Sequence, residues 1–263
     1  PEDKLKLTEN TQPAILAVSY ALFSVLKKEF QFDFKTTKFF AGHSLGEYSA
    51  LVCSESLTYQ DALHLLFERG KSMQEAVPVG KGSMIAVLGS KVDEINNYLK
   101  LIKIKDACEI ANDNAEGQTI ISGDVKSIIS LQDVLKENKK KFIPLNVSAP
   151  FHCSLMKPAA EKMKDKILSV EFKKPLFDII CNVTAKPENN SESIKKLLID
   201  QICSTVRWRE SIIYMAKEKI TNFIEIGPGK VLSGMVKRTV KGKNCFSINS
   251  INDIKNLVNE LKR

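Results

Sequence analysis

A serine between two glycines, Gly42-x-Ser44-x-Gly46, constrains the fold of this chain more than any other feature. The glycines permit a tight turn that leaves the serine hydroxyl exposed. Apolar residues 39–41 precede the motif and predict the end of a buried strand, while residues 45–53 predict a helix. Strand, sharp turn and helix is the setting in which such a serine acts as a nucleophile. An ordinary strand-to-helix turn, with Ser44 as a helix cap, is the alternative that this stretch leaves open.

Length and composition allow one large domain, or one domain that carries a smaller insert. The chain has 263 residues, of which 43% are hydrophobic and 27% are charged, as in ordinary globular proteins. No apolar run approaches the roughly 20 residues that cross a bilayer. The polar first residues lack the apolar stretch of a signal peptide. We therefore expect a soluble protein that makes no use of a membrane.

The charge and cysteine patterns exclude several classes of function. The formal net charge is +8, but basic residues are mixed with acidic ones along most of the chain. No arginine-rich helix or aromatic–basic pattern indicates nucleic-acid binding. The excess of positive charge therefore fits a solvated surface, or the attraction of an acidic partner or an anionic substrate. The six cysteines form no C-x-x-C pair, which argues against zinc and favours free thiols in a reducing compartment.

Residues 83–147 differ in pattern from the rest of the chain. Predicted elements follow the order β-α-β-β-α-β there, which is typical of a ferredoxin-like unit. Residues 1–82 and 148–263 alternate strands with helices, which predicts a large α/β domain with a mainly parallel sheet. We expect Thr11 to cap the first long helix, with Pro13 in its first turn. Pro187 is expected to close a strand that begins near Leu176.

A serine hydroxyl needs a base before it becomes a good nucleophile. The chain offers three histidines, and His43 lies inside the turn, where chain geometry makes it a poor base for its neighbour. His64 lies on a predicted helix and is expected to be an ordinary surface or core residue. By elimination His152, in a loop after the insert, is the candidate base. A backbone carbonyl could orient it, and the loop 227–230 is one possible source.

Arg69 is the remaining residue with a candidate role. It lies on the predicted helix after the one that follows Ser44, in a chain with few arginines. A planar guanidinium can grip a substrate carboxylate at two points. The alternative is a surface salt bridge to Glu68 or Glu75.

Five blocks of the sequence form a pattern that extends beyond the serine motif. They are Gly42 to Cys53, Glu68 to Pro78, Pro150 to Ala160, Cys181 to Ala185, and Gly227 to Leu232. Together they resemble one enzyme family, malonyl-CoA:acyl carrier protein transacylase of type II fatty acid synthesis. They keep the order and spacing of that family from about residue 10 to residue 240, which is far more specific than the serine motif alone.

The resemblance implies a two-step, ping-pong transfer of malonyl from CoA to the phosphopantetheine thiol of acyl carrier protein, through a malonyl ester on the serine. The implied fold is an α/β-hydrolase-like large domain with an inserted ferredoxin-like small domain. No cofactor or metal is implied, because the partner carries the phosphopantetheine. The implied residues are Ser44 as nucleophile, His152 as base, Arg69 on the malonyl carboxylate, the Leu45 amide as an oxyanion donor, Asn114 in the cleft, and Phe151 as a mark of malonyl-selective members.

The family normally opens with a strand and a Gly-Gln-Gly-Ser-Gln loop, placed before the point at which this sequence begins. That loop supplies a second oxyanion-hole amide. Because losing one such donor costs about 100- to 1000-fold in rate, we expect the chain as given to be a poor catalyst. A monomer is the simpler expectation for its assembly. A bacterial-type cytoplasm or an organelle, such as a plastid, apicoplast or mitochondrion, would suit it.

Two other classes of function stay open. A serine hydrolase or thioesterase could use the same turn, and would release free malonate without an acceptor thiol. A non-catalytic carrier-protein-binding module would bind acyl carrier protein and transfer nothing.

Overall fold

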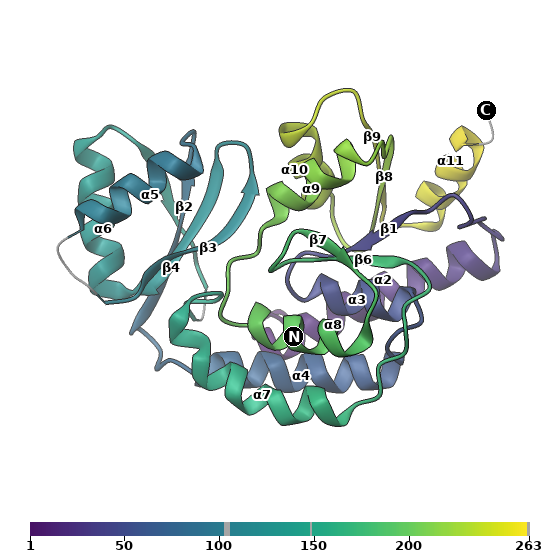
Figure 1. The fold of residues 1–263 in the computed structure, drawn as a ribbon, viewed down its shortest axis with the longest axis horizontal. Helices are drawn as coiled ribbons and strands as arrows, with labels where there is room; N and C mark the ends of the chain where they lie inside the picture. The colour runs from purple at the N-terminus through teal and green to yellow at the C-terminus, as the bar shows by residue number, and fades with distance from the viewer. Residues whose placement is uncertain (103–105, 148, 262–263) are drawn as a thin grey trace.

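Helices and strands alternate along the whole chain, which makes the structure a mixed α/β fold (Figure 1). It is a computed structural model that describes residues 1–102, 106–147 and 149–261. Two units lie side by side in Figure 1, a smaller one around β2 to β5 and a larger one that holds both ends of the described chain.

The smaller unit is an antiparallel sheet with two helices on one face. Its elements are β2 (Gly82–Leu88), α5 (Val92–Leu101), β3 (Cys108–Ala115), β4 (Gln118–Asp124), α6 (Val125–Glu137) and β5 (Lys141–Pro144), and the strand order is β3-β4-β2-β5. Side chains alternate across β2, as the pleat requires. Ile85 and Val87 pack against the helices, whereas Met84 and Ala86 point to the opposite face, where they meet Phe151 of the larger unit.

The larger unit holds the remaining elements. In chain order they are α1 (Glu2–Leu5), α2 (Thr8–Lys28), β1 (Phe39–Ala41), α3 (Gly46–Cys53), α4 (Tyr59–Glu75), η1 (Ser154–Met156), α7 (Lys157–Ser169), β6 (Asp178–Cys181), β7 (Lys186–Glu188), α8 (Ser191–Gln201), α9 (Trp208–Lys217), β8 (Asn222–Ile226), α10 (Val231–Thr239), β9 (Asn244–Ile248) and α11 (Ile251–Leu261). Helices α2, α4, α7 and α8 pack in succession around an apolar core that contains Leu16, Leu51 and Leu65.

The strands of the larger unit do not form one sheet over the described residues. β1 pairs in parallel with β6, β6 pairs in antiparallel fashion with β7, and β8 pairs in parallel with β9. The expectation that Pro187 closes a strand is wrong, because Pro187 lies inside β7, opposite Ile180. β7 has a partner on one side only, so a residue without an N–H donor is tolerated there.

The start of α2 also differs from the expectation. The helix begins at Thr8, one turn earlier than predicted, and Thr11 does not cap it. Instead, the Thr11 hydroxyl donates to the carbonyl oxygens of Leu5 and Leu7. Leu5 is the last residue of α1, so its bond with Thr11 ties α1 to α2, whereas Leu7 is the N-cap of α2.

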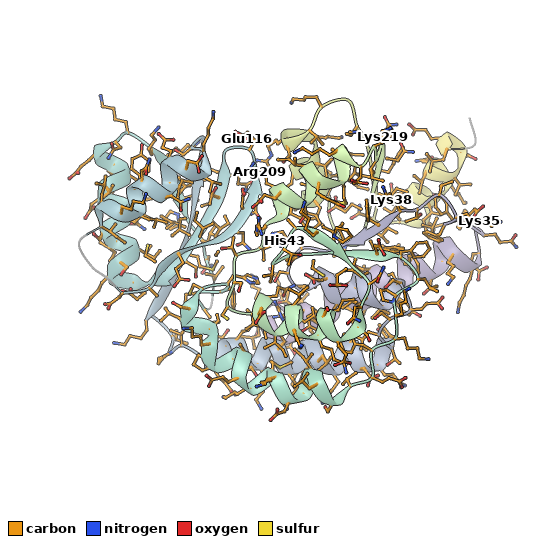
Figure 2. All side chains as sticks on the ribbon, in the orientation of Figure 1. Lys35, Lys38, His43, Glu116, Arg209 and Lys219 are labelled. Atoms are coloured by element: carbon orange, nitrogen blue, oxygen red, sulfur yellow. The ribbon has the colours of Figure 1, made fainter. Side chains whose placement is uncertain are left out.

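The two units are joined by more than their two chain crossings. The Asp113 N–H donates to the Val206 carbonyl (3.0 Å), and the Val206 N–H donates to the Ala111 carbonyl (2.8 Å), which adds a short parallel bridge to β3. Arg209 on α9 reaches the carboxylate of Asp113 at 2.9 Å, and Figure 2 shows it at this boundary. The chain passes between the units near Gly82 and Pro150. The predicted return to the large domain at Ser148 falls on a residue outside the described ones.

Across the described ranges, no helix is both long enough and apolar enough to cross a membrane.

Candidate active site

The turn at residues 42–46 holds Ser44 in an unusual backbone conformation. Ser44 follows β1, precedes α3 and has φ of 53°, in the left-handed region that costs a non-glycine residue about 1–3 kcal/mol. The two glycines of the motif are not equivalent. A Cβ atom at Gly42 would lie 1.9 Å from the Gly46 carbonyl oxygen, whereas one at Gly46 would meet open space. Gly42 is therefore the residue that the tight turn requires.

Asn182 clamps this turn from the adjacent strand. Its Oδ1 accepts from the Ser44 N–H (2.7 Å), and its Nδ2 donates to the Gly42 carbonyl (2.8 Å). Asn182 directly follows β6, which runs parallel to β1, so the two strands end at the same edge of the sheet. This residue lies in the sequence block from Cys181 to Ala185, but no role is predicted for it from the sequence.

His152 lies against the serine hydroxyl. Its Nε2 is 2.7 Å from Ser44 Oγ, and its Nδ1 is 2.9 Å from the Gln201 carbonyl oxygen. Because a carbonyl oxygen only accepts, Nδ1 carries the proton and Nε2 is left free to accept from the serine. The suggestion that loop 227–230 supplies this carbonyl is wrong. Gln201 ends α8, where helix carbonyls lack partners within the helix, and it supplies the acceptor instead.

The surroundings of His152 keep its imidazole neutral. Burial, reinforced by the positive charge of Arg69, lowers the pKa of His152 from 6.5 to about 3. A neutral ring can take a proton at neutral pH, as a general base must. The C-terminal end of α8, with its partial negative charge, lies at Nδ1 and favours the imidazolium that forms during proton transfer.

Arg69 is buried beside Ser44, with only 1% of its surface exposed. Nη2 donates to Ser44 Oγ (3.1 Å) and Gln201 Oε1 (2.9 Å), and Nη1 donates to Gln12 Oε1 (2.6 Å). The surface salt bridge considered above is excluded. Glu68 pairs with Lys166 and Glu75 pairs with Lys162, both away from Arg69.

A cavity of about 380 Å³ opens onto these groups. Ser44, His152 and Arg69 lie in its wall together with Leu45 and Phe151, and Met84 and Ile120 of the smaller unit close the other side. The cavity thus lies between the two units, with Ser44, His152 and Arg69 together in its wall.

Asn114 does not line this cavity over the described residues, although the family resemblance implied a place in the cleft; the asparagines in the wall are Asn112 and Asn146. Asn114 Oδ1 instead lies 2.8 Å from Nε2 of His43, whose ring meets Trp208 edge-on at 5.6 Å (Figure 2 labels His43). His43 is therefore a packed, hydrogen-bonded residue, and the expectation that it is not the base agrees with this position. His64 is exposed on α4.

The backbone N–H of Leu45 is available beside the nucleophile. Leu45 is the N-cap of α3, and no hydrogen bond from its N–H to another described residue is formed. An amide at the positive end of a helix is suited to a developing negative charge. Among the residues that the structure describes, no three His, Cys, Asp or Glu side chains gather closely enough to hold a metal ion.

Polar residues that the sequence did not single out complete the site. Gln12 and Gln201 hold the guanidinium of Arg69, and Glu47 accepts from the backbone N–H of Asn182 and from Gln201 Nε2. All five of these residues are buried. Gln12, Gln201 and Glu47 lie within helices whose pattern of apolar residues gives no sign of them.

A serine at a strained strand-to-helix turn, a neutral histidine on its hydroxyl and a buried arginine beside both define a serine acyltransferase. Residues 1–261 match the acyl transferase domain. The chain belongs to the malonyl CoA-acyl carrier protein transacylase family. It is 42% identical over 262 residues to the transacylase of Bacillus subtilis, covering 99% of this chain and 81% of that protein.

Solved structures agree with this assignment. An acyl-carrier-protein S-malonyltransferase from Bartonella henselae superposes with a TM-score of 0.96 at 38% identity, covering all of this chain and 84% of the other. A malonyl-transacylase in complex with its type II PKS acyl-carrier protein gives a TM-score of 0.94 at 37% identity, covering 99% and 84% of the two chains.

Proposed function

We propose that this chain transfers malonyl from CoA to the phosphopantetheine thiol of an acyl carrier protein in fatty acid biosynthesis. One observation carries the proposal. Ser44 Oγ lies within hydrogen-bond distance of both a neutral imidazole nitrogen and a buried guanidinium, at 2.7 Å and 3.1 Å. Nucleophile, base and a cation for a free carboxylate thus meet at one end of the cavity. The names of the relatives support the same activity.

In the first half-reaction, Ser44 Oγ attacks the thioester carbonyl of malonyl-CoA while His152 Nε2 takes the hydroxyl proton. The negative charge on the carbonyl oxygen faces the Leu45 N–H, which is the donor that the described site offers. The carbon–sulfur bond breaks, His152 returns the proton to the CoA sulfur, and a malonyl ester remains on Ser44.

In the second half-reaction, the phosphopantetheine thiol of the partner attacks the ester carbonyl and gives its proton to His152. The bond to Ser44 Oγ breaks, and His152 protonates the departing serine. No electrons are exchanged with an outside group, so the chemistry needs no cofactor beyond the phosphopantetheine of the partner. The donor and the product are both thioesters, so the second half-reaction is the first one run in reverse with a different thiol. One base, His152, can therefore serve both half-reactions.

Arg69 supplies selectivity in this scheme. A malonyl group on Ser44 ends in a carboxylate that can fold back to the guanidinium 3.1 Å from the ester oxygen. Ionic hydrogen bonds of this kind are about twice as strong as neutral ones. Gln12 and Gln201 hold the guanidinium plane in place without neutralising its charge. An acetyl group has no carboxylate, so it forms no ionic hydrogen bond with Arg69.

The fold supports a finer description. The element order and strand order of residues 83–147 fit a ferredoxin-like insert, and the turn at Ser44 fits an α/β-hydrolase-like large domain built from residues 1–82 and 148–263. All six cysteines are free, which fits a reducing compartment such as a bacterial cytoplasm or an organelle interior. We infer that the chain acts as a monomer, with Phe151 in the cavity wall favouring the malonyl group.

The transfer assay separates this proposal from a hydrolase and from a binding module. The chain is incubated with radiolabelled malonyl-CoA, with and without holo-acyl carrier protein. A transacylase labels the carrier protein and releases little free malonate without it. Free malonate as the main product would instead indicate a hydrolase. Carrier-protein binding without label on either protein would indicate a binding module.

A further inference from the structure

Glu47, on the first turn of α3, has no part in the steps above, yet it is fully buried, with 0% of its surface exposed. Its Oε2 accepts two hydrogen bonds, from the backbone N–H of Asn182 (3.0 Å) and from Nε2 of Gln201 (2.8 Å). Buried charges are retained in proteins only where hydrogen bonds or opposite charges compensate them. One carboxylate oxygen therefore connects two segments that each reach the reacting groups.

The first segment leads to the nucleophile. Asn182 uses its side chain to hold the Ser44 N–H and the Gly42 carbonyl, so it fixes both ends of the strained turn. Glu47 holds the backbone of Asn182 and thereby the position of this clamp.

The second segment leads to the base and the arginine. The Gln201 carbonyl oxygen orients His152, and Gln201 Oε1 accepts from Arg69. A glutamine amide can be turned over, which exchanges its oxygen and its nitrogen. A carboxylate and a backbone carbonyl only accept, whereas a guanidinium only donates, so Glu47 and the Ser44 carbonyl (3.1 Å) together hold Nε2, while Arg69 holds Oε1. In the turned-over state an oxygen would face Glu47 and an NH₂ group would face the guanidinium.

We propose that Glu47 is a positioning residue for malonyl transfer, whose carboxylate fixes the Gln201 amide and so presents Arg69 and His152 to Ser44 in one arrangement. This inference rests on the proposed function, and it goes beyond that function by assigning the buried acid of the site. Glu47 touches neither the substrate nor the reacting atoms, so its effect passes through Gln201 and Asn182.

The charged and titratable groups around Glu47 come from three elements. Arg69 on α4 stabilises its charge, the Cys181 thiol of β6 faces it, and Tyr48 follows it on α3. Burial raises the pKa of Tyr48 to about 12 and raises that of Cys181, so both stay neutral near pH 7. Burial also raises the pKa of Glu47 to about 7, against its hydrogen bonds and Arg69. Glu47 is thus the group that changes charge near neutral pH.

The test compares Glu47→Gln with the wild-type chain in kcat/KM for malonyl transfer to holo-acyl carrier protein, from about pH 6 to about pH 8. At the upper pH we expect a loss of about 10-fold, because the amide oxygen of the variant accepts the same two bonds as a neutral group, and ionic hydrogen bonds are about twice as strong as neutral ones. Toward the lower pH the ratio of wild type to variant should shrink, because wild-type Glu47 itself becomes protonated. A purely structural role would give a ratio that does not change with pH, and that result overturns the proposal.

A matched control is Glu225→Gln. Glu225 also accepts from two backbone N–H groups, those of Leu232 and Ser233, but it is not among the described residues that line the cavity. The Glu225→Gln variant should be less stable than the wild-type chain, but it should show no pH-dependent loss of malonyl transfer. The same pH-dependent loss in both variants would contradict a role specific to Glu47.

Gln201→Met keeps the inference testable if Glu47→Gln does not fold. This variant retains the backbone carbonyl that orients His152 but removes the amide between Glu47 and Arg69. It should reduce malonyl transfer by a similar factor, and the double variant should lose little more than either single one, because the residues act in series. Full, independent losses in the double variant, or an unaffected Gln201→Met, would overturn the inference. A wild-type chain that transfers no malonyl would instead overturn the proposed function.

Discussion

Nη2 of Arg69 lies 3.1 Å from Oγ of Ser44, on a guanidinium that is almost completely removed from solvent. Burial lowers the pKa of the neighbouring His152, and the cation in this position lowers it further. The same cation can bind an anionic group on the acyl chain. The same contact therefore links the acid–base chemistry of the site to its choice of substrate.

Replacement of Arg69 should change selectivity more than it changes the chemistry. In Arg69→Met the malonyl carboxylate loses its ionic hydrogen bonds, which are worth about 1.5–3 kcal/mol each, so malonyl transfer should fall about 10- to 100-fold relative to acetyl transfer. Single-turnover acylation with malonyl-CoA and acetyl-CoA measures the ratio. Equal losses for both acyl groups would show that Arg69 does not bind the carboxylate.

The protonation of His152 provides a test that is independent of turnover. With a pKa of about 3, the ring should remain neutral from neutral pH down to about pH 5, so its Cε1–H resonance should not shift over that range. Arg69→Met removes a neighbouring positive charge and should raise this pKa. His152→Gln identifies the resonance. A midpoint near the ordinary value of 6.5 in the wild-type chain would contradict the buried, neutral state.

The same shift has a consequence for stability. Because the folded pKa of His152 is depressed, the unfolded chain binds the proton first as pH falls below 6.5, and the folded state loses stability from there toward pH 3. Between pH 7 and pH 5, His152→Gln should therefore lose less unfolding free energy than the wild type. Urea unfolding at the two pH values measures this difference, and parallel losses would argue against it.

Asn182 should be essential for the shape of the turn at Ser44. Asn182→Ala removes its bonds to the Ser44 N–H and to the Gly42 carbonyl, which should lower the unfolding free energy by about 1–3 kcal/mol and slow acylation. Asn189→Ala is a suitable control, since Asn189 follows β7, is exposed, and bonds the half-buried Asp178 instead of the turn at Ser44. Thermal unfolding and acylation rates would be compared. Equal behaviour of the two variants would remove Asn182 from the site.

The contact between the two units should be sensitive to Arg209. Arg209→Met leaves the carboxylate of Asp113 buried without its partner and should cost about 3 kcal/mol, a low value for a buried pair because Arg209 is partly exposed. The double variant with Asp113→Asn should recover part of this loss, since the unpaired charge is gone. Additive losses would contradict the pairing.

The pKa of Asp113 gives that prediction a pH dependence. Burial raises this pKa in the folded state, even though Arg209 opposes the shift. Without Arg209 the pKa should rise further, so the folded state of the variant takes up a proton first as pH falls. The deficit of Arg209→Met should therefore shrink at acidic pH.

Much of the fold follows from periodicity in the sequence. The alternation of strands and helices over residues 83–147 is local, and each predicted element there is present within a few residues. The errors in the larger unit have tertiary causes. α1 supplies the Leu5 carbonyl that accepts from Thr11, and β7 accommodates Pro187 because it pairs with β6 on one side. Neither neighbour is visible in a pattern of apolar residues.

The candidate site also contains some residues that the sequence indicates and others that only tertiary packing brings in. Ser44 has a local motif, His152 was found by elimination among three histidines, and Arg69 lies in a distinctive sequence block. The carbonyl that orients His152 comes from the end of α8, and not from the loop 227–230, because the packing of that helix decides it. Three further residues act only through their buried contacts, namely Gln12, Glu47 and Gln201. A single polar residue within a predicted helix does not indicate such a contact.

The central claim, that Ser44 carries malonyl between two thiols, is tested most directly by a single-turnover chase followed by intact-mass spectrometry. The chain is mixed with one equivalent of malonyl-CoA, and holo-acyl carrier protein is then added. We expect a malonyl adduct that maps to Ser44, that passes to the carrier protein on its addition, and that Ser44→Ala never forms. An adduct on another residue, or one that disappears as free malonate while the carrier protein stays unmodified, would contradict the claim.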